Sequence, residues 1–336
     1  MPGSAAGATV FKSGLEGYAC YRIPALVSAG GGRLLAFAEG RRYSCSDHDW
    51  NDIVMKRSED GGQTWGNLSV VVTESTPSDH ITDGNPAPVL LRNGTLLLPY
   101  SRNNKEVFVV SSHDVGASWT APQNITRAAV GAGWTWVATG PPGSVELPSG
   151  DIVVPCDHIE SGGATGSHTL RWSSSSNEWQ LQQLLTAGNE CQAALLGNGS
   201  MLLGMRPRSR ATGRLFAMSD NGGATFGPAR SEPSLRDPEC QGSLVSGGSP
   251  QTVYQSNADS SESRANVTVH VSRDGGGTWA VLAAPYDGPS AYSSLAVTSS
   301  SESSKSTSLG LLWEAWPQGA PSYAQIAFVT LEDDMA

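Results

Sequence analysis

The chain has 336 residues, with 39 glycines, 20 prolines and a formal net charge of −10. This acidity, and the lack of any stretch that is both basic and aromatic, argue against a nucleic-acid or anionic-membrane surface. No apolar segment approaches the length of a membrane-spanning helix, and the first residues lack the layout of a secretory signal. We therefore expect a soluble chain and leave its compartment open.

One short phrase recurs along the chain. Its copies are SEDGGQTW at 58–65, SHDVGASW at 112–119, DNGGATF reached from Ser219, and SRDGGGTW at 272–279. Their first serines lie 54, 107 and 53 residues apart, so the middle gap holds two periods and one degenerate copy, WSSSSNEW at 172–179. This period is typical of one blade of a β-propeller and fits into the chain about six times.

Each copy can be understood as a hairpin turn. An aspartate such as Asp60 or Asp274 can accept hydrogen bonds from nearby backbone N–H groups, and the glycines permit positive φ. The final tryptophan can pack into the seam beside the turn. The phrase is therefore expected to form scaffold rather than a site.

Short apolar runs, most of them after a glycine-bearing turn, predict the strands. They are LLAFAE at 34–39, TLLLPY at 95–100, DIVVPC at 151–156, MLLGM at 201–205 and GLLWEA at 310–315. Helical periodicity is scarce. The sequence thus predicts an all-β chain, a six-bladed β-propeller with four-stranded antiparallel blades, forming one domain over residues 1–336.

The two ends of the chain suggest how the ring closes. ATVF near the N-terminus can pair with AQIAFVTL near the C-terminus, so residues 1–15 are expected either to be flexible or to contain the closing strand.

Neither the cysteines nor the glycosylation sequons decide the compartment. The five cysteines show no metal or dense disulfide spacing, and Cys191 and Cys240 either pair or remain buried free thiols. Sequons would be glycosylated only in a eukaryotic secretory route, and NGT and NGS are also ordinary hairpin turns. The sequons begin at Asn67, Asn93, Asn124, Asn198 and Asn266.

Three arginines stand in unusual apolar surroundings. They are Arg22 in YRIP, Arg206 in MRP, and Arg264 before the strand ANVTVHVS. If they converge on the propeller axis, they form a cationic pocket that is costly unless an anion fills it. Three guanidinium groups suit a carboxylate.

With these motifs the chain resembles the exo-α-sialidases, or neuraminidases, a family of retaining glycoside hydrolases with repeated Asp boxes on six-bladed propellers. The resemblance runs from about residue 16 to the C-terminus. Besides YRIP and the Asp boxes, it rests on FAEGRR at 37–42, GNPAPV at 84–89, WVATGPPGSVEL at 136–147, NECQ at 189–192, PECQGSL at 238–244, PSAYSSLAV at 289–297 and LLWE at 311–314.

The resemblance implies a site for the sialic acid carboxylate. Arg22, Arg206 and Arg264 would form the arginine triad that binds it. Arg273 competes with Arg264 for the third place, but it lies inside an Asp turn and is expected on the outside. Glu314 matches the carboxylate that holds the first arginine in place.

The resemblance also implies the catalytic groups. Tyr292 matches the nucleophile and Glu190 the carboxylate that takes its proton; a neutral phenol suits an anomeric centre that bears a carboxylate. Asp47 would be the acid/base, with Asp49 as the alternative. In isolation, Asp47, His48, Asp49 and Asp52 could pass for a metal site, but they crowd one loop and the mechanism requires no metal or other cofactor.

Two further residues concern the sugar ring. Arg41 resembles the family arginine that faces the C4 side of the sugar and the acid loop. Asp83 lies in the loop that resembles the part of the pocket near the N-acyl group. A carboxylate there could favour a hydroxyl over an acetyl group, which leads to the hypothesis of a preference for deaminated sialic acid.

The predicted function is hydrolysis of terminal sialic acids from glycoproteins, glycolipids or oligosaccharides, with retention. Trans-sialidase activity is the nearest alternative, with Trp50, Trp134 and Trp136 as candidate acceptor platforms. A non-catalytic Asp-box propeller that binds glycans would have no reason to keep the catalytic groups and the arginines together. A glycosidase using paired carboxylates would lack the arginine triad.

Overall fold

The computed structural model describes residues 7–301 and 306–334, and this part of the chain is almost entirely β-structure. Its one helix, α1 (Thr126–Ala129), has four residues. No helix in the described residues is long and apolar enough to cross a membrane. The expected all-β class and the scarcity of helix are confirmed.

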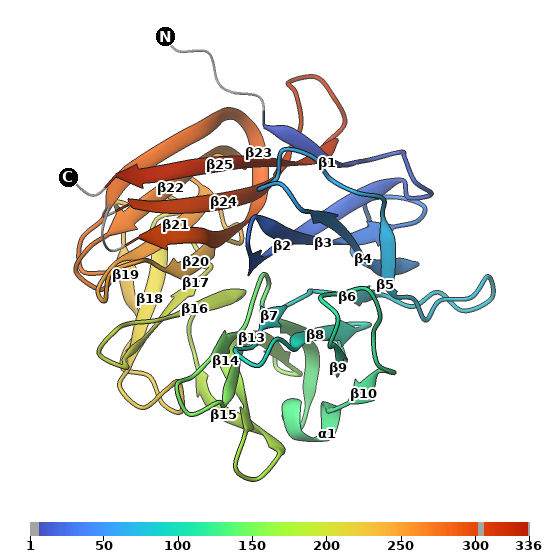
Figure 1. The fold of residues 1–336 in the computed structure, drawn as a ribbon. Coiled ribbons are helices and arrows are strands. Elements are labelled where there is room, and N and C mark those ends of the chain that lie inside the picture. The colour runs from blue at the N-terminus through green and yellow to red at the C-terminus, as the bar shows by residue number, and fades with distance from the viewer. Residues whose placement is uncertain (1–6, 302–305, 335–336) are drawn as a thin grey trace.

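The strands form four small sheets and one large sheet, placed side by side around a common centre (Figure 1). Every pair of named strands is antiparallel. The first small sheet contains, in order, β2 (Cys20–Gly30), β3 (Arg33–Arg41), β4 (Asn51–Ser58) and β5 (Ser69–Val72). The second contains β6 (Asp83–Gly84), β7 (Val89–Leu90), β8 (Leu96–Arg102), β9 (Glu106–Ser112) and β10 (Gln123–Asn124).

The next two small sheets follow in chain order. The third contains β11 (Trp134–Thr139), β12 (Val145–Glu146), β13 (Ile152–Glu160), β14 (Thr165–Ser173) and β15 (Glu178–Leu185). The fourth contains β16 (Cys191–Leu195), β17 (Met201–Met205), β18 (Arg214–Ser219) and β19 (Arg230–Glu232). Each of the five predicted apolar runs lies largely within a strand, namely β3, β8, β13, β17 and β24.

The large sheet has seven strands in the order β1-β25-β24-β23-β22-β21-β20. Its long central strand pairs with β22 through residues 280–289 and with β24 from Ser290 onward. Its strands are β1 (Ala8–Lys12), β20 (Ser243–Ser246), β21 (Val253–Ala258), β22 (Ala265–Ser272), β23 (Ala280–Ser301), β24 (Ser306–Ala315) and β25 (Gln325–Asp334).

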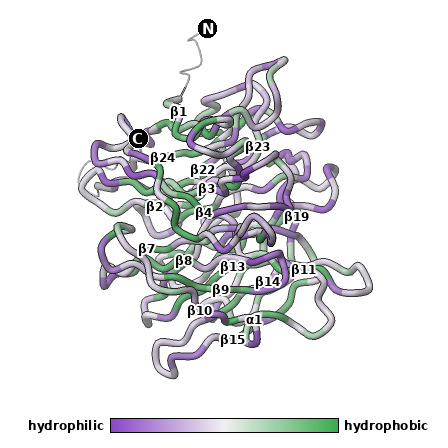
Figure 2. The backbone as a smooth tube through the Cα atoms, turned by 90° about the vertical axis from the view of Figure 1, so that its right-hand side faces the viewer, coloured by the Kyte–Doolittle hydropathy of each residue, from purple (hydrophilic) through white to green (hydrophobic). Residues whose placement is uncertain are grey.

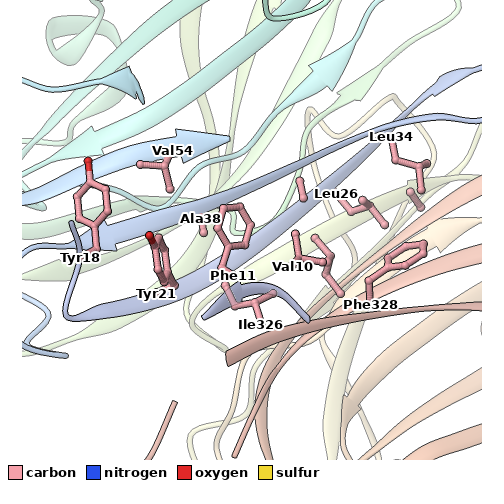
Figure 3. Close-up of a cluster of buried hydrophobic side chains, with 13 residues drawn as sticks. Val10, Phe11, Tyr18, Tyr21, Leu26, Leu34, Ala38, Val54, Ile326 and Phe328 are labelled. Atoms are coloured by element: carbon pink, nitrogen blue, oxygen red, sulfur yellow. The ribbon is translucent and has the colours of Figure 1, made fainter. Parts of the chain in front are cut away.

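The predicted closing strand is confirmed. β1 pairs with β25 in antiparallel register, with Ala8 opposite Phe328. Val10 and Phe11 of β1 join Ile326 and Phe328 of β25 in a buried cluster against the first sheet (Figure 3). The N-terminal strand therefore helps to fill the seam between the last and first parts of the ring. Residues 1–6, which were part of the same expectation, lie outside the described residues.

The repeated phrase forms the predicted turns, which join β4 to β5, β9 to β10, β18 to β19 and β22 to β23. In the first copy, the Ser58 hydroxyl donates to Asp60 at 2.8 Å and accepts from the N–H of Gly62 at 2.8 Å. Asp60 also accepts from the N–H of Thr64 at 2.9 Å. The other copies repeat these bonds, with Asn221 in the aspartate position of the third.

The tryptophans of the turns pack across seams. Trp65 contacts Phe328, Trp119 contacts Phe37 and Trp279 stacks on Phe216, with ring centroids 5.2–6.1 Å apart. Hydrophobic residues follow the strands and hydrophilic residues are frequent in the connecting loops (Figure 2).

The cysteines are arranged in a way that the sequence did not reveal. Cys20 and Cys45 form a disulfide, whereas Cys156, Cys191 and Cys240 are free and buried. The suggested Cys191–Cys240 bond is therefore wrong, and its alternative of buried free thiols is confirmed.

Candidate active site

A pocket of about 260 Å³ opens where the five sheets meet. It is lined by residues from, or directly beside, strands of every sheet. Among the predicted residues, Arg41, Asp47, Glu190, Arg206 and Tyr292 line it. The pocket therefore assembles groups that are far apart in the sequence.

Tyr292 is the centre of the polar network. Its phenolic O–H donates a short hydrogen bond to Glu190 Oε1. The Nη1 atom of Arg206 lies 2.8 Å from Glu190 Oε2 and 3.3 Å from the phenolic oxygen. Burial and the neighbouring Glu190 carboxylate raise the pKa of Tyr292 well above its ordinary value, while Arg206 and Arg22 act in the opposite direction. The phenol is thus neutral at rest, with a proton acceptor in contact.

The other two predicted arginines also meet at Tyr292. The guanidinium carbon of Arg22 lies 4.8 Å from the centre of the Tyr292 ring, and that of Arg264 lies 5.5 Å from it. Arg264 donates to the hydroxyl of Tyr323 at 3.2 Å and forms no ion pair within residues 7–301 and 306–334. The three arginines converge, and one of them keeps an uncompensated charge that favours an anion.

Arg273 lies elsewhere. Its guanidinium pairs with Asp333 at 2.8 Å and its side chain is 47% exposed. Of the two candidates for the third arginine, the structure brings only Arg264 to the pocket region.

Glu314 connects the first arginine to the tyrosine. This fully buried carboxylate accepts from Arg22 Nε at 3.0 Å and from Arg22 Nη2 at 3.2 Å. It also accepts from the backbone N–H of Ile23 at 2.9 Å and of Tyr292 at 3.1 Å. All four donors therefore depend on one side chain.

The backbone is irregular at both of these strands. The pairing of β2 shifts between Arg22 and Ala25, where Ile23 adopts φ 57°, and the pairing of β23 shifts between Ser290 and Ser293. A β-branched residue at positive φ is uncommon and costs free energy. Such bulges redirect side chains, and here the two N–H groups that they free from the ladder point at Glu314.

Asp47 lies on the loop 42–50 between β3 and β4, facing two cations. Its Oδ1 lies 2.7 Å from Arg41 Nη1 and 3.3 Å from Arg22 Nη1, while its side chain is 64% exposed. Partial burial raises the pKa of Asp47, but Arg41 and Arg22 outweigh this and the pKa is lowered. Arg41 is itself fixed by Glu39, whose Oε2 lies 2.7 Å from Arg41 Nη2.

The remaining acidic and histidine side chains of the loop region point to other partners. Asp49 lies 2.7 Å from His80, and Asp52 accepts from the hydroxyl of Tyr18 at 2.7 Å. His48 packs edge-on against Trp136. Asp47 is therefore the one of these four that reaches the pocket, and the four do not gather as ligands of one ion.

Asp83, which was expected in the pocket, does not line it. Its neighbours Thr82 and Asn85 line the pocket, but the Asp83 carboxylate is fully buried and accepts from the N–H of Glu74 at 3.2 Å. Its side chain therefore lies behind the pocket lining, beside Glu74. Burial, with Glu74 nearby, raises the pKa of Asp83 to about 8.

Sequence reasoning missed several polar groups in the pocket. Asp157 of β13 is buried and accepts from the amide of Asn189 at 3.1 Å. Burial, with Glu190 nearby, raises the pKa of Asp157 well above its ordinary value. An acidic residue within the apolar run IVVPCDHI was the available signal for it. Asn189 opens the motif NECQ, although no role was assigned to it, and Tyr323, which contacts Arg22 and Arg264, lies in none of the motifs.

Comparisons with known proteins agree with this geometry. A family model described as a BNR repeat-like domain matches residues 32–304. An exo-α-sialidase of Arthroderma benhamiae is 30% identical over 298 residues, covering 77% of this chain and 68% of the relative. An exo-α-sialidase of Aspergillus fumigatus is 29% identical over 291 residues, covering 77% and 69%.

The fold is shared with solved sialidases. The Hadza microbial sialidase Hz136 superposes with a TM-score of 0.84 at 25% identity, covering 97% of this chain and 68% of that one. The intramolecular trans-sialidase from Ruminococcus gnavus gives a TM-score of 0.77 at 13% identity, covering 98% of both chains. On the sequence match, the shared fold and the assembled pocket, the chain belongs to the sialidase family.

Proposed function

We propose that this protein is an exo-α-sialidase that releases terminal sialic acids from glycoconjugates with retention of configuration, through a covalent intermediate on Tyr292. The observation that carries the proposal is the contact of the Tyr292 hydroxyl with Glu190 and Arg206, beside the guanidinium groups of Arg22 and Arg264. A nucleophile, its base and a carboxylate site thus lie within one small pocket.

The scaffold in this proposal is one domain of six blades. The large sheet divides at β23, whose first part completes the unit β20–β23 and whose second part begins a unit closed by β25 and β1. The large sheet thus supplies two four-stranded units. Together with the four small sheets, they support the six blades that the repeat period predicts.

In the first step, the substrate carboxylate binds the three arginines, and the Tyr292 oxygen attacks the anomeric carbon as its proton passes to Glu190. Asp47 donates a proton to the departing oxygen, so that the glycosidic bond breaks and the aglycone leaves as an alcohol. In the second step, Asp47 takes a proton from water, the water oxygen displaces Tyr292, and Glu190 returns the proton to the phenol.

Asp47 must be protonated to act first as an acid. In the free protein, Arg41 and Arg22 hold its pKa low. A substrate carboxylate that draws Arg22 away removes one of these cations and covers the carboxyl group. Both changes raise the pKa of Asp47, so binding prepares the acid.

The test is release of the fluorophore from an aryl α-sialoside. Wild-type protein should hydrolyse it, NMR should show the α-anomer of sialic acid as the first product, and Tyr292→Phe should lose most of kcat. The methyl ester of the same substrate should react about 100-fold more slowly, because it lacks the charge that the arginines bind. Failure to release the fluorophore while binding sialosides would contradict hydrolysis and support a glycan-binding propeller.

A further inference from the structure

The disulfide between Cys20 and Cys45 joins the two segments that supply the first arginine and the acid of the pocket. Cys20 stands two residues before Arg22 in β2, and Cys45 stands two residues before Asp47 in the loop 42–50. Residues i and i+2 of a strand share a face, so Cys20 and Arg22 project to the same side of β2. The bond therefore links the loop that carries the acid to the strand that carries the arginine.

The tip of this loop is attached to the rest of the chain through side chains and the disulfide. Within the described chain, no backbone-to-backbone hydrogen bond involves residues 43–49. The Ser46 hydroxyl bonds only within the tip, to His48. The carbonyl of Cys45 accepts from Arg41 at 2.7 Å, and Asp47 meets Arg41 and Arg22. On the other side of Asp47, Asp49 exchanges hydrogen bonds with the Thr82 hydroxyl and lies 2.7 Å from His80. Asp47 is thus held by two arginines, by the disulfide two residues before it and by Asp49 two residues after it.

Bound substrate would weaken one of these attachments. A sialoside carboxylate competes with Asp47 for the Arg22 guanidinium, whose other edge is already occupied by Glu314. On the side of the loop that precedes Asp47, Arg41 and the disulfide are then the remaining attachments at the moment when Asp47 must reach the departing oxygen. Small displacements of a catalytic group cost large factors in rate.

We propose that the Cys20–Cys45 disulfide is a positioning element for Asp47, fixing the distance from which this residue protonates the leaving oxygen. The inference rests on the proposed sialidase function. It assigns the two cysteines to the acid step and not to carboxylate binding or to the Tyr292 nucleophile.

The acid step can be isolated through the leaving group. A 4-nitrophenolate leaves readily without a proton, whereas the alcohol of sialyllactose needs one. The ratio kcat/KM reports the steps up to cleavage of the glycosidic bond, so it excludes the later role of Asp47 as a base. A displaced Asp47 should therefore affect sialyllactose and spare the nitrophenyl substrate, an effect that general loss of structure would not produce.

The experiment compares Cys45→Ser, Cys20→Ser and the control Cys156→Ala on both substrates. Cys156 is a buried free cysteine of β13 that is not assigned to the site. We expect Cys45→Ser and Cys20→Ser to lower kcat/KM for sialyllactose about 10- to 100-fold and for the nitrophenyl sialoside less than about threefold. Cys156→Ala should leave the ratio of the two values unchanged.

A second arm keeps the test valid if a variant does not fold. Wild-type protein is treated with dithiothreitol, whose two thiols are oxidised to a cyclic disulfide while Cys20 and Cys45 gain two electrons and two protons. The reduced protein should show the same selective loss, reversed on reoxidation.

An equal fall on both substrates, or no fall on either, would overturn the inference while leaving the proposed function intact. If wild-type protein cleaves neither substrate, the proposed function fails first and this inference fails with it.

Discussion

The repeated turns and the central pocket use the same kinds of polar side chain, but they satisfy them over very different distances along the chain. In a turn, Asp60 bonds to residues two to four positions away. In the pocket, Tyr292 meets Glu190 across 102 residues, and Arg22 meets Glu314 across 292. Damage to a turn should therefore remain local, whereas damage to the pocket should reach groups from several sheets.

The largest effect is expected for Glu314→Gln. This change places an amide against four donors and leaves the exposed Asp47 as the charge partner of the buried Arg22. Removing one partner of a buried ion pair typically costs about 3–5 kcal/mol. We expect a large fall in the free energy of unfolding and a fall of about 100-fold or more in kcat/KM for an aryl sialoside. Denaturant titration and kinetics measure both quantities.

The matched control for that prediction is Glu332→Gln. Glu332 lies on β25, beside the strand of Glu314, and its exposed side chain accepts a hydrogen bond from the half-buried Ser308 at 2.6 Å. It should be close to neutral. If Glu314→Gln kept wild-type kinetics, the pocket would tolerate loss of the Arg22–Glu314 contact, which spans 292 residues. That result would contradict the expectation that damage to the pocket reaches groups from several sheets.

Asp83 should show a pH dependence of stability opposite to that of Asp60. Burial raises the pKa of Asp83 to about 8, so the folded state binds more protons than the unfolded state between about pH 4 and pH 8. The contribution of Asp83 to the free energy of unfolding is fully present below pH 4 and is lost as the pH rises toward 8. The slope of this loss is up to about 1.4 kcal/mol per pH unit.

Asp83→Asn should remove this slope, so the variant should gain stability relative to wild type from pH 5 to pH 8. Hydrogen bonds from Thr64 lower the pKa of Asp60 to about 2. Its contribution is therefore present above pH 4 and is lost as the pH falls toward 2. Thermal melts over this pH range test both groups, and parallel curves for Asp83→Asn and wild type would contradict the assignment.

The smallest effect is expected in the turns. Asp60→Ala removes the acceptor for Thr64 and should lower the melting temperature by a few degrees with kcat/KM unchanged. Asp60→Asn provides the control, because Asn221 already fills this position in the third turn with the same bond geometry. A loss of activity in Asp60→Ala with no change in melting temperature would show that the turns and the pocket are not separable.

The difference between contacts that are local in the sequence and contacts between distant residues explains which features the sequence could predict. The turns, the strands and the closing pair β1 and β25 follow from local patterns and one repeat period, so they were predictable. Several pocket residues were identified only through motifs shared with a family, since no local rule brings Tyr292 to Glu190.

Where the place of a side chain depends on the local path of the backbone or on a distant partner, the sequence did not predict it. Asp83 is adjacent to the pocket residue Thr82, yet its carboxylate is fully buried outside the pocket lining. The Cys20–Cys45 bond depends on how the loop 42–50 folds back over β2, and the spacing of the cysteines alone did not reveal it.

The central claim, that Tyr292 becomes the covalent carrier of the sugar, is tested most directly by trapping the intermediate. A sialosyl fluoride with a second fluorine at C3 can transfer its sugar while the electron-withdrawing fluorine slows the hydrolysis that follows. Mass spectrometry of the intact protein should show one added fluorosialyl group, and peptide mapping should place it on Tyr292. A label on Glu190 or Asp47, or turnover of the reagent with no label in rapidly quenched samples, would contradict the account.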